Sequence, residues 1–257
     1  MWWSMLLCWW LHIQLLQLWP CTAIREAIRA VYQDCRLWED INTGTVTVKP
    51  VGTEKLLCLN IHQSLKWKEH VISNKKSMIK TLTTRLNALR KLSINATFKT
   101  RLMVANSCFM SIIIYMVSVW GGTEDYIVRA VQVMQNKAAR CVTKQSWFTP
   151  TKRLLLQCNW LSIKQLIFFH TALQVWRVKA SKCPVYIESK LQLCKTRSSA
   201  QGNLLVPVVE RSSSSKSFMV RSAVTWNQIP AEIRSCKSLE TFKRNLKQWI
   251  KANVEIT

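Results

Sequence analysis

Carboxylates and histidines are the side chains that most often perform catalysis, and this sequence has few aspartates and histidines. It has only three aspartates: Asp34, Asp40 and Asp125. Two-metal phosphoryl transfer needs two or three convergent carboxylates to hold both ions, and no aspartate here stands in a strand–turn–strand context that would bring a second one close. P-loop, G-x-S-x-G and H-E-x-x-H motifs are absent, and four histidines are isolated from one another: His12, His62, His70 and His170. We therefore predict no catalytic residue and no small-molecule substrate.

Cysteine spacing likewise argues against a metal site. Ten cysteines are scattered without any C-x-x-C pair, at positions 8, 21, 35, 58, 108, 141, 158, 183, 194 and 236. A zinc ribbon or knuckle needs closely spaced ligand pairs, because one turn must present two ligands to the ion. Cys58 and His62 could share a helix face near His70, but no fourth ligand follows at a useful spacing. We predict no metal and no cofactor. Isolated cysteines of this kind are usually buried and reduced, which favours the nucleus or cytoplasm.

Basic side chains are the functional groups that this sequence concentrates. Its 257 residues include 37 Lys and Arg against 13 Asp and Glu, a formal charge of +24. Residues 1–57 hold five of each sign, so residues 58–257 hold 32 bases (37 less 5) and 8 acids (13 less 5) and carry the whole excess. Such an imbalance indicates a polyanionic partner, nucleic acid before an acidic membrane.

One predicted helix carries a large share of this charge. From 74 to 92 the apolar residues recur every three or four positions, which predicts an amphipathic helix. Six basic residues occupy much of the rest of it and are our candidates for nucleic-acid binding: Lys75, Lys76, Lys80, Arg85, Arg90 and Lys91. Lysines can also simply solvate the outside of a bundle, but a solvated face normally mixes both signs, and residues 72–123 contain no acid. Phosphate contact is therefore the favoured interpretation.

The remaining chain predicts a mainly α protein, a helical bundle preceded by a short β-hairpin. Residues 43–49 and 55–61 are expected to pair as strands across a turn at 50–52. Further helices are expected over 95–120, 124–144, 149–157, 162–180 and 239–252, with short helical segments after 184 and 218. We divide the chain into an unassigned Trp-rich N-terminus (1–42), a hairpin with helical bundle (43–195), a flexible Ser-rich linker (196–217) and a C-terminal helical extension (218–257).

Two uncharged runs leave a membrane alternative open. Residues 1–20 hold five tryptophans and no charge, and they read either as a membrane anchor or targeting segment, or as a fortuitous N-terminus without a selected role. Residues 102–123 are long enough to cross a bilayer. Polar residues punctuate this second run and basic helices flank it, so a buried helix of a soluble bundle is the favoured interpretation.

Seven segments follow one another along the chain: LKWKEHV (65–71) with the hairpin ahead of it, NALRKLS (87–93), VWGG (119–122) with Tyr115, QNKAARCVT (135–143), TPTKRLLLQCNWLSIKQL (149–166), RSAVTWNQIPAEIR (221–234) and SLETFKRNLKQW (238–249). Together they resemble the region downstream of the catalytic palm in reverse transcriptases of non-long-terminal-repeat retrotransposons. Each is a short amphipathic pattern, and their order and spacing over roughly 43–255 carry the resemblance.

The resemblance implies a reverse-transcriptase thumb-like bundle without its polymerase centre. The family's centre uses an aspartate pair in a Y/F-A-D-D turn, and this sequence lacks that turn. The expectation is a truncated, non-catalytic copy that retains the last palm hairpin, the thumb and its helical extension. Because the family's thumb grips the template–primer duplex by its backbone, the six basic residues would contact an RNA/DNA duplex without reading its sequence. The alternatives are a membrane-associated protein anchored by residues 1–20 and a degenerate reading frame with no function.

Overall fold

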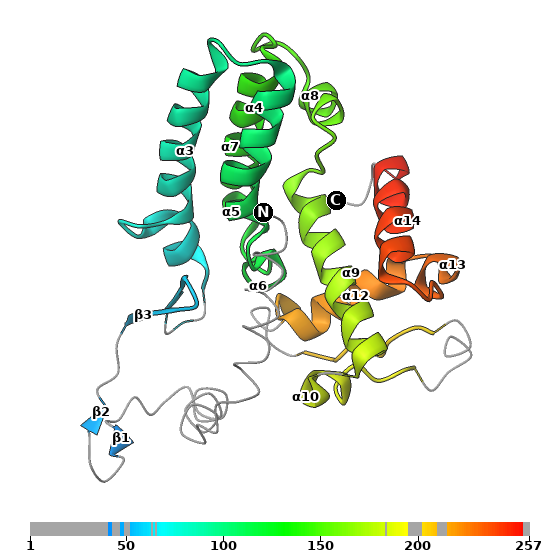
Figure 1. Cartoon of the computed structure of the whole chain (residues 1–257). Helices are drawn as coiled ribbons and strands as arrows, with labels where there is room; N and C mark the ends of the chain where they lie inside the picture. Colours follow the sequence, from blue (N-terminus) through cyan, green and yellow to red (C-terminus); the bar gives the residue numbers. More distant parts are fainter. Residues whose placement is uncertain are drawn as a thin grey trace. The chain divides into compact units, whose positions relative to one another are not determined.

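The fold comes from a computed structural model, which describes part of the chain in two compact units (Figure 1). The described residues are 41–42, 47–48, 52–62, 64, 66–182, 184–194, 202–209 and 215–253. The first unit, residues 1–52, contains one described strand pair, β1 (Ile41–Asn42) with β2 (Thr47–Val48). The second unit, residues 53–257, contains everything else discussed below. The apolar N-terminus at 1–20 lies outside the described residues.

A two-residue turn closes the hairpin at a different place from the one predicted. Strand β3 (Thr53–Leu56) pairs antiparallel with β4 (Leu59–His62), Leu56 opposite Leu59. The intervening Leu57 and Cys58 both have positive φ, 48° and 64°, the backbone of a tight hairpin turn whose twist matches that of the strands. The predicted pairing of 43–49 with 55–61 was therefore wrong, because Thr47 and Val48 pair instead with β1. A short hairpin preceding the helices is confirmed.

The predicted mainly helical fold is confirmed. The first half of the bundle comprises a π-helical turn η1 (Glu69–Ser73), α3 (Met78–Ser93), α4 (Phe98–Val104), the π-helical η2 (Ala105–Met110), α5 (Ser111–Ile114), α6 (Val117–Trp120), α7 (Asp125–Thr143) and α8 (Thr151–Gln157). The second half comprises α9 (Ile163–Ser181), α10 (Val185–Glu188), α12 (Phe218–Gln228), α13 (Ala231–Arg234) and α14 (Leu239–Ala252). Helix α3 packs against α7 and α4, and α9 against α12 and α14.

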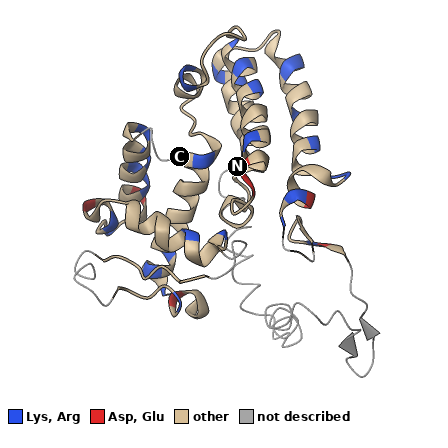
Figure 2. Ribbon diagram, turned by 180° about the vertical axis from the view of Figure 1, so that it is seen from behind, with Lys and Arg blue, Asp and Glu red and all other residues tan. Residues whose placement is uncertain are grey.

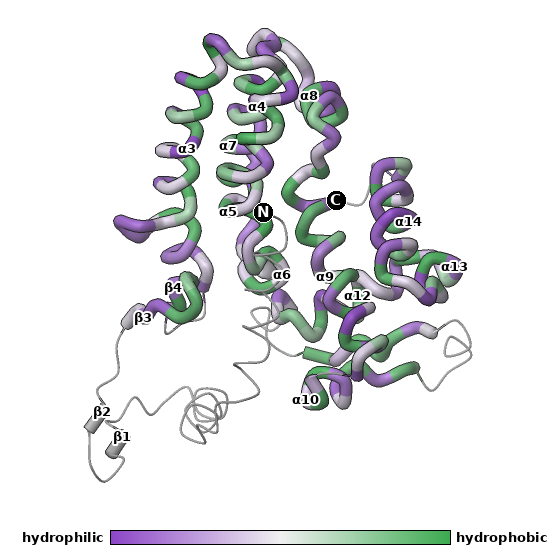
Figure 3. The backbone as a smooth tube through the Cα atoms, in the orientation of Figure 1, coloured by the Kyte–Doolittle hydropathy of each residue, from purple (hydrophilic) through white to green (hydrophobic). Residues whose placement is uncertain are grey.

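Helix α3 begins four residues later than its apolar periodicity predicted. Ser77 is extended and stands at the N-cap, while the Asn74 side chain accepts a hydrogen bond from the Lys76 amide at 3.2 Å. This local bond holds residues 74–77 as a turn, as asparagine often does just ahead of a helix. The buried face of α3 is formed by the expected apolar residues, Met78, Leu82, Leu86 and Leu89. Figure 3 shows the resulting alternation of hydrophobic and hydrophilic positions along it.

The predicted single helix over 95–120 is broken near its end. After α5, Tyr115 leaves the helical conformation and Met116 takes a left-handed one, with φ 51°, before α6 begins. The break lets Trp120 be fully buried while its indole donates to the Tyr115 carbonyl at 3.1 Å. Within the described ranges, no helix is long and apolar enough to cross a membrane.

Arg101, the first charge before that apolar run, joins the α3–α4 loop to the last turn of α7. It is 6% exposed, and its guanidinium donates to the Val142 carbonyl at 2.8 Å and to the Ala96 carbonyl at 2.6 Å. Val142 lies in the last turn of α7, where carbonyls lack partners within the helix, and Ala96 lies in the α3–α4 loop. Arg101 therefore fixes the α3–α4 loop against the C-terminus of α7.

Replacing Arg101 with leucine should lower the free energy of unfolding by about 2–3 kcal/mol, because two charge-assisted hydrogen bonds disappear and their acceptors stay partly buried. Urea denaturation followed by circular dichroism measures the change. Lys99→Leu, at an exposed position on the same helix, is the matched control and should stay within about 0.5 kcal/mol of the parent. Equal stability of the two variants would contradict the role given to Arg101.

The C-terminal helices pack onto α9 through aromatic rings. Phe242 of α14 is fully buried and stacks on Trp176 of α9 with ring centroids 5.8 Å apart. Its other close ring is Trp226 of α12, at 6.1 Å. Helix α9 begins with the predicted Ser162 cap, here a complete capping box with Gln165.

Part of the predicted flexible linker, 196–217, is packed rather than free. Leu204 is fully buried and forms an isolated antiparallel bridge with Leu193. The Asn227 side chain accepts from the Leu204 amide at 2.8 Å and donates to its carbonyl at 2.9 Å. The neighbouring Trp226 donates to the Gly202 carbonyl at 3.2 Å. Residues 202–204 are thus held like a strand edge against α12. The Ser212–Ser214 stretch lies outside the described residues.

Candidate nucleic-acid interface

Two of the six candidate residues share one exposed face of α3. At about 100° per residue, positions 80, 84, 87 and 91 fall within about 60° of one another around the helix. We call this face the outer stripe: Lys80, Thr84, Asn87 and Lys91, all exposed. The stripe lies opposite the buried residues of α3, and its two lysines are about 16 Å apart along the axis. That is roughly the length of five nucleotide steps of one duplex strand.

Lys75 and Lys76 lie just ahead of this stripe rather than on the helix. Both are exposed, in the turn held by Asn74 that precedes Ser77. They extend the set of exposed cations beyond the N-terminal end of α3. With the two lysines of the outer stripe they form what we call the four-lysine set: Lys75, Lys76, Lys80 and Lys91.

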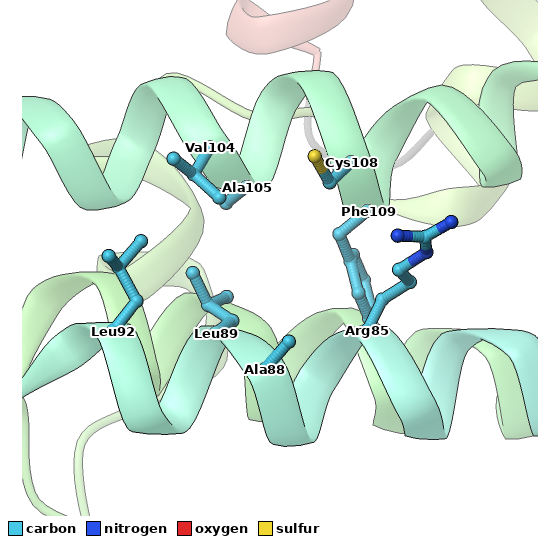
Figure 4. Close-up of a pocket in the computed structure, with 8 residues that line it drawn as sticks. All are labelled: Arg85, Ala88, Leu89, Leu92, Val104, Ala105, Cys108 and Phe109. Atoms are coloured by element: carbon cyan, nitrogen blue, oxygen red, sulfur yellow. The ribbon is translucent and has the colours of Figure 1, made fainter.

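Arg85 lies on a flank of α3 that faces another helical segment. It is five residues from Lys80, about 140° around the helix. Its side chain stands at one end of a groove of about 300 Å³ between α3 and the α4–η2 segment, beside Phe109 (Figure 4). The rest of the groove is apolar except for a cysteine and is lined by Ala88, Leu89, Leu92, Val104, Ala105 and Cys108. Arg85 therefore does not belong to the outer stripe.

Arg90 lies on the opposite flank, toward α7. Its guanidinium donates to the Asn87 side chain at 3.2 Å and lies close to the Cys141 thiol of α7. Burial raises the pKa of that thiol, and the hydrogen bond and positive charge of Arg90 partly oppose the rise. The six predicted residues are thus all exposed, but Arg85 and Arg90 flank the outer stripe, whereas the other four lie on it or directly ahead of it in the chain.

The field around these residues has few negative contributions, of which the nearest in sequence is Glu69 of η1, ahead of Lys75. No acid occurs between 70 and 123 or between 126 and 187, so α3, α4, α8 and α9 carry none, and α7 carries only Asp125, its first residue. Among the described residues two ion pairs form, Lys216 with Glu124 and Lys243 with Glu240, and neither involves a candidate residue. Figure 2 shows that basic positions recur along α3 and at the end of the bundle that carries the α3–α4 and α7–α8 loops, and that acidic positions are few.

Sequence reasoning missed a second group at that end of the bundle. The α7–α8 loop, residues 144–150, exposes two adjacent aromatic side chains, Trp147 at 69% and Phe148 at 90%. The guanidinium of Arg140 lies over the Trp147 ring, 4.7 Å from its centroid. The detectable signal was an aromatic pair in a polar loop between two basic helix ends, the arrangement expected where bases stack on a protein.

Metal-ligating side chains do not gather in the part of the chain that the structure describes, where no three His, Cys, Asp or Glu residues lie close enough to hold an ion. Burial raises the pKa of the Cys158 thiol to about 11 and, with the charge of Arg177, lowers the pKa of His170 to about 4. Both groups therefore stay neutral near pH 7; the Cys158 thiol lies in the core, and His170 of α9 is half-buried. Comparisons with protein families, with curated proteins and with solved structures found no match to this chain.

Proposed function

We propose that this chain is the non-catalytic, thumb-like region of a retrotransposon-type reverse transcriptase, and that its bundle binds nucleic-acid duplexes by their phosphate backbone. The observation that carries the proposal is the outer stripe of α3 with the two lysines ahead of it, four exposed cations in a stretch of chain (70–123) that contains no acid. The sequence resemblance supplies the kind of duplex, a hybrid of RNA template and DNA primer.

The chemistry of these side chains favours backbone contact over base reading. Lysine is a flexible point charge that pairs with phosphate oxygens, whereas base discrimination relies mainly on bidentate contacts from arginine, asparagine or glutamine. Thr84 and Asn87, between the two lysines of the stripe, are uncharged and not bulky, so a phosphate strand can approach the helix closely. Binding of this type is independent of sequence and releases counterions, so it weakens steeply with salt.

The salt dependence of binding tests the proposal. The full chain should bind two hybrid duplexes of unrelated sequence with affinities within about threefold of each other. If three or four phosphates are neutralised, the plot of log affinity against log salt should have a slope of about −3, a loss of about 10²-fold between 50 and 200 mM salt. Fluorescence anisotropy with labelled duplexes measures both quantities. If the affinity did not depend on salt, or if one sequence were strongly preferred, binding through the phosphate backbone would be excluded.

A further inference from the structure

The exposed aromatic pair of the α7–α8 loop is held in place from several directions. Lys144 ends α7 with a left-handed backbone, φ 54°, and its ammonium donates to the Ile94 carbonyl of the α3–α4 loop at 3.3 Å. Arg140 donates to the Trp147 carbonyl at 3.2 Å while its guanidinium covers one face of the indole. The Thr149 amide donates to the Ser146 carbonyl at 3.1 Å. The loop is therefore ordered before any ligand binds, which lowers the entropy cost of using it as a binding surface.

The position of these two rings differs from that of ordinary exposed apolar residues. Since Arg140 covers one face of the Trp147 indole, the exposure of that ring must come mainly from its opposite face and its edges. Phe148 is nine-tenths exposed, so its ring has almost no contact with the protein. Exposing a large apolar ring to water costs free energy in proportion to the exposed area. The flat π-face of such a ring can stack on the face of another planar group.

The charges around the pair select the kind of planar group. Lys99 at the start of α4 and Lys152 and Arg153 at the start of α8 are exposed, and the nearest acids in sequence are at 125 and 188. The pair also lies at the end of the bundle reached by the C-terminus of α3, where Lys91 of the outer stripe is located. Base–aromatic stacking beside cations is how proteins hold single strands without reading their sequence.

We propose that Trp147 and Phe148 form a stacking site for unpaired bases, where the single-stranded end of a nucleic acid leaves the duplex bound along α3. The inference rests on the proposed function and adds a preference for duplexes that carry a single-stranded overhang. Arg140 positions the Trp147 ring, and the lysines of α4 and α8 contact the phosphates between stacked bases. A membrane surface also binds aromatic and basic side chains. However, the cations continue from the loop along α3, and such an elongated array fits a nucleic-acid strand better than a bilayer, which the loop would contact only with its tip.

The test compares a blunt hybrid duplex with the same duplex carrying an overhang of six thymidines, using the full chain and the double variant Trp147→Ala/Phe148→Ala. Loss of one stacked base weakens binding by about 5- to 150-fold, so the variant should bind the overhang duplex at least about fivefold more weakly. Its affinity for the blunt duplex should change by less than about twofold. Replacing the rings conservatively, Trp147→Phe/Phe148→Tyr, should restore most of the difference.

The controls separate the two proposals. Val185→Ala/Tyr186→Ala removes a similarly exposed apolar pair on α10, next to Glu188, and should leave both affinities unchanged. If the loop variant binds the overhang duplex as well as the parent does, the stacking site is wrong while the backbone grip stands. If the parent shows no salt-dependent binding to either duplex, the proposed backbone binding along α3 is wrong. If the variant loses binding to phosphatidylserine vesicles but not to the overhang, the loop is a membrane contact and our inference is overturned.

Discussion

Phe242→Ala is expected to lower the free energy of unfolding by about 3–5 kcal/mol, a large part of the stability of a domain of this size. The ring is fully buried between Trp176 of α9 and Trp226 of α12, at centroid distances of 5.8 and 6.1 Å. Truncation removes its apolar contacts and leaves a cavity between two large rings that cannot easily move together. Urea denaturation followed by circular dichroism and by tryptophan fluorescence measures the loss.

The same experiment tests whether α12–α14 fold together with the bundle. Because residues 53–257 form one compact unit, both probes should report a single transition in the parent and in the variant. Phe242→Leu, which keeps most of the volume, should cost only about 1 kcal/mol. A first transition confined to α12–α14, with the rest of the bundle unfolding at the parent's urea concentration, would show that the C-terminal extension is an independent domain.

The helices could be predicted from the sequence because each carries its own local signal. Helix α7 has an apolar residue every three or four positions, and α9 adds the Ser162–Gln165 capping box at its start. Strand pairing had no such signal. The hairpin turn uses Leu57 and Cys58 in left-handed conformations, where sequence rules expect glycine, asparagine or aspartate, so the Pro-Val-Gly stretch at 50–52 looked like the better turn.

Other features depend on contacts between residues distant in sequence. Met116 breaks the long apolar helix without glycine or proline, because the left-handed turn lets α6 bury Trp120. Leu204 stands in a polar stretch that looks like a linker, and it is fixed by Asn227, 23 positions later. A short window of local sequence predicts neither the break at Met116 nor the burial of Leu204. These positions are decided by tertiary packing, which routinely overrides local preference.

The candidate site was predictable in composition but not in geometry. The distribution of charge identified the six basic residues, yet a helix assigned from position 74 placed Lys75 and Lys76 on it. The 11-residue spacing of Lys80 and Lys91 already indicated a shared face, three helical turns apart. That Arg85 and Arg90 face other segments instead could only come from knowing what packs on each side of α3. The aromatic pair at 147–148 had a signal in the sequence that was overlooked, but its exposure and the position of Arg140 over the Trp147 ring could come only from the structure.

Replacing the four-lysine set with glutamine should weaken binding to a hybrid duplex by about 10²–10³-fold at 100 mM salt, and it should make the salt slope shallower by about 3, which removes nearly all of the salt dependence. Each lysine that pairs with a phosphate releases about one counterion. The number of lysine–phosphate contacts that the variant loses therefore sets both the loss of affinity and the change in slope. All four side chains are exposed and none packs in the core, so thermal unfolding should change little.

Two further variants decide whether position matters or only net charge. Lys182, Lys190, Lys237 and Arg244 are also exposed but lie on other elements, and replacing them with glutamine lowers the formal charge from +24 by the same amount. If the outer stripe grips the backbone, this scattered variant should lose less than about fivefold, since long-range charge is screened beyond about 10 Å at this salt. The double variant Arg85→Gln/Arg90→Gln should lose less than about threefold, because those two side chains flank the stripe. Equal losses from the scattered and the four-lysine variants would mean that the chain attracts nucleic acid only by its overall charge. If the arginine pair had the largest effect, the binding face would lie on the sides of α3 and not on the outer stripe.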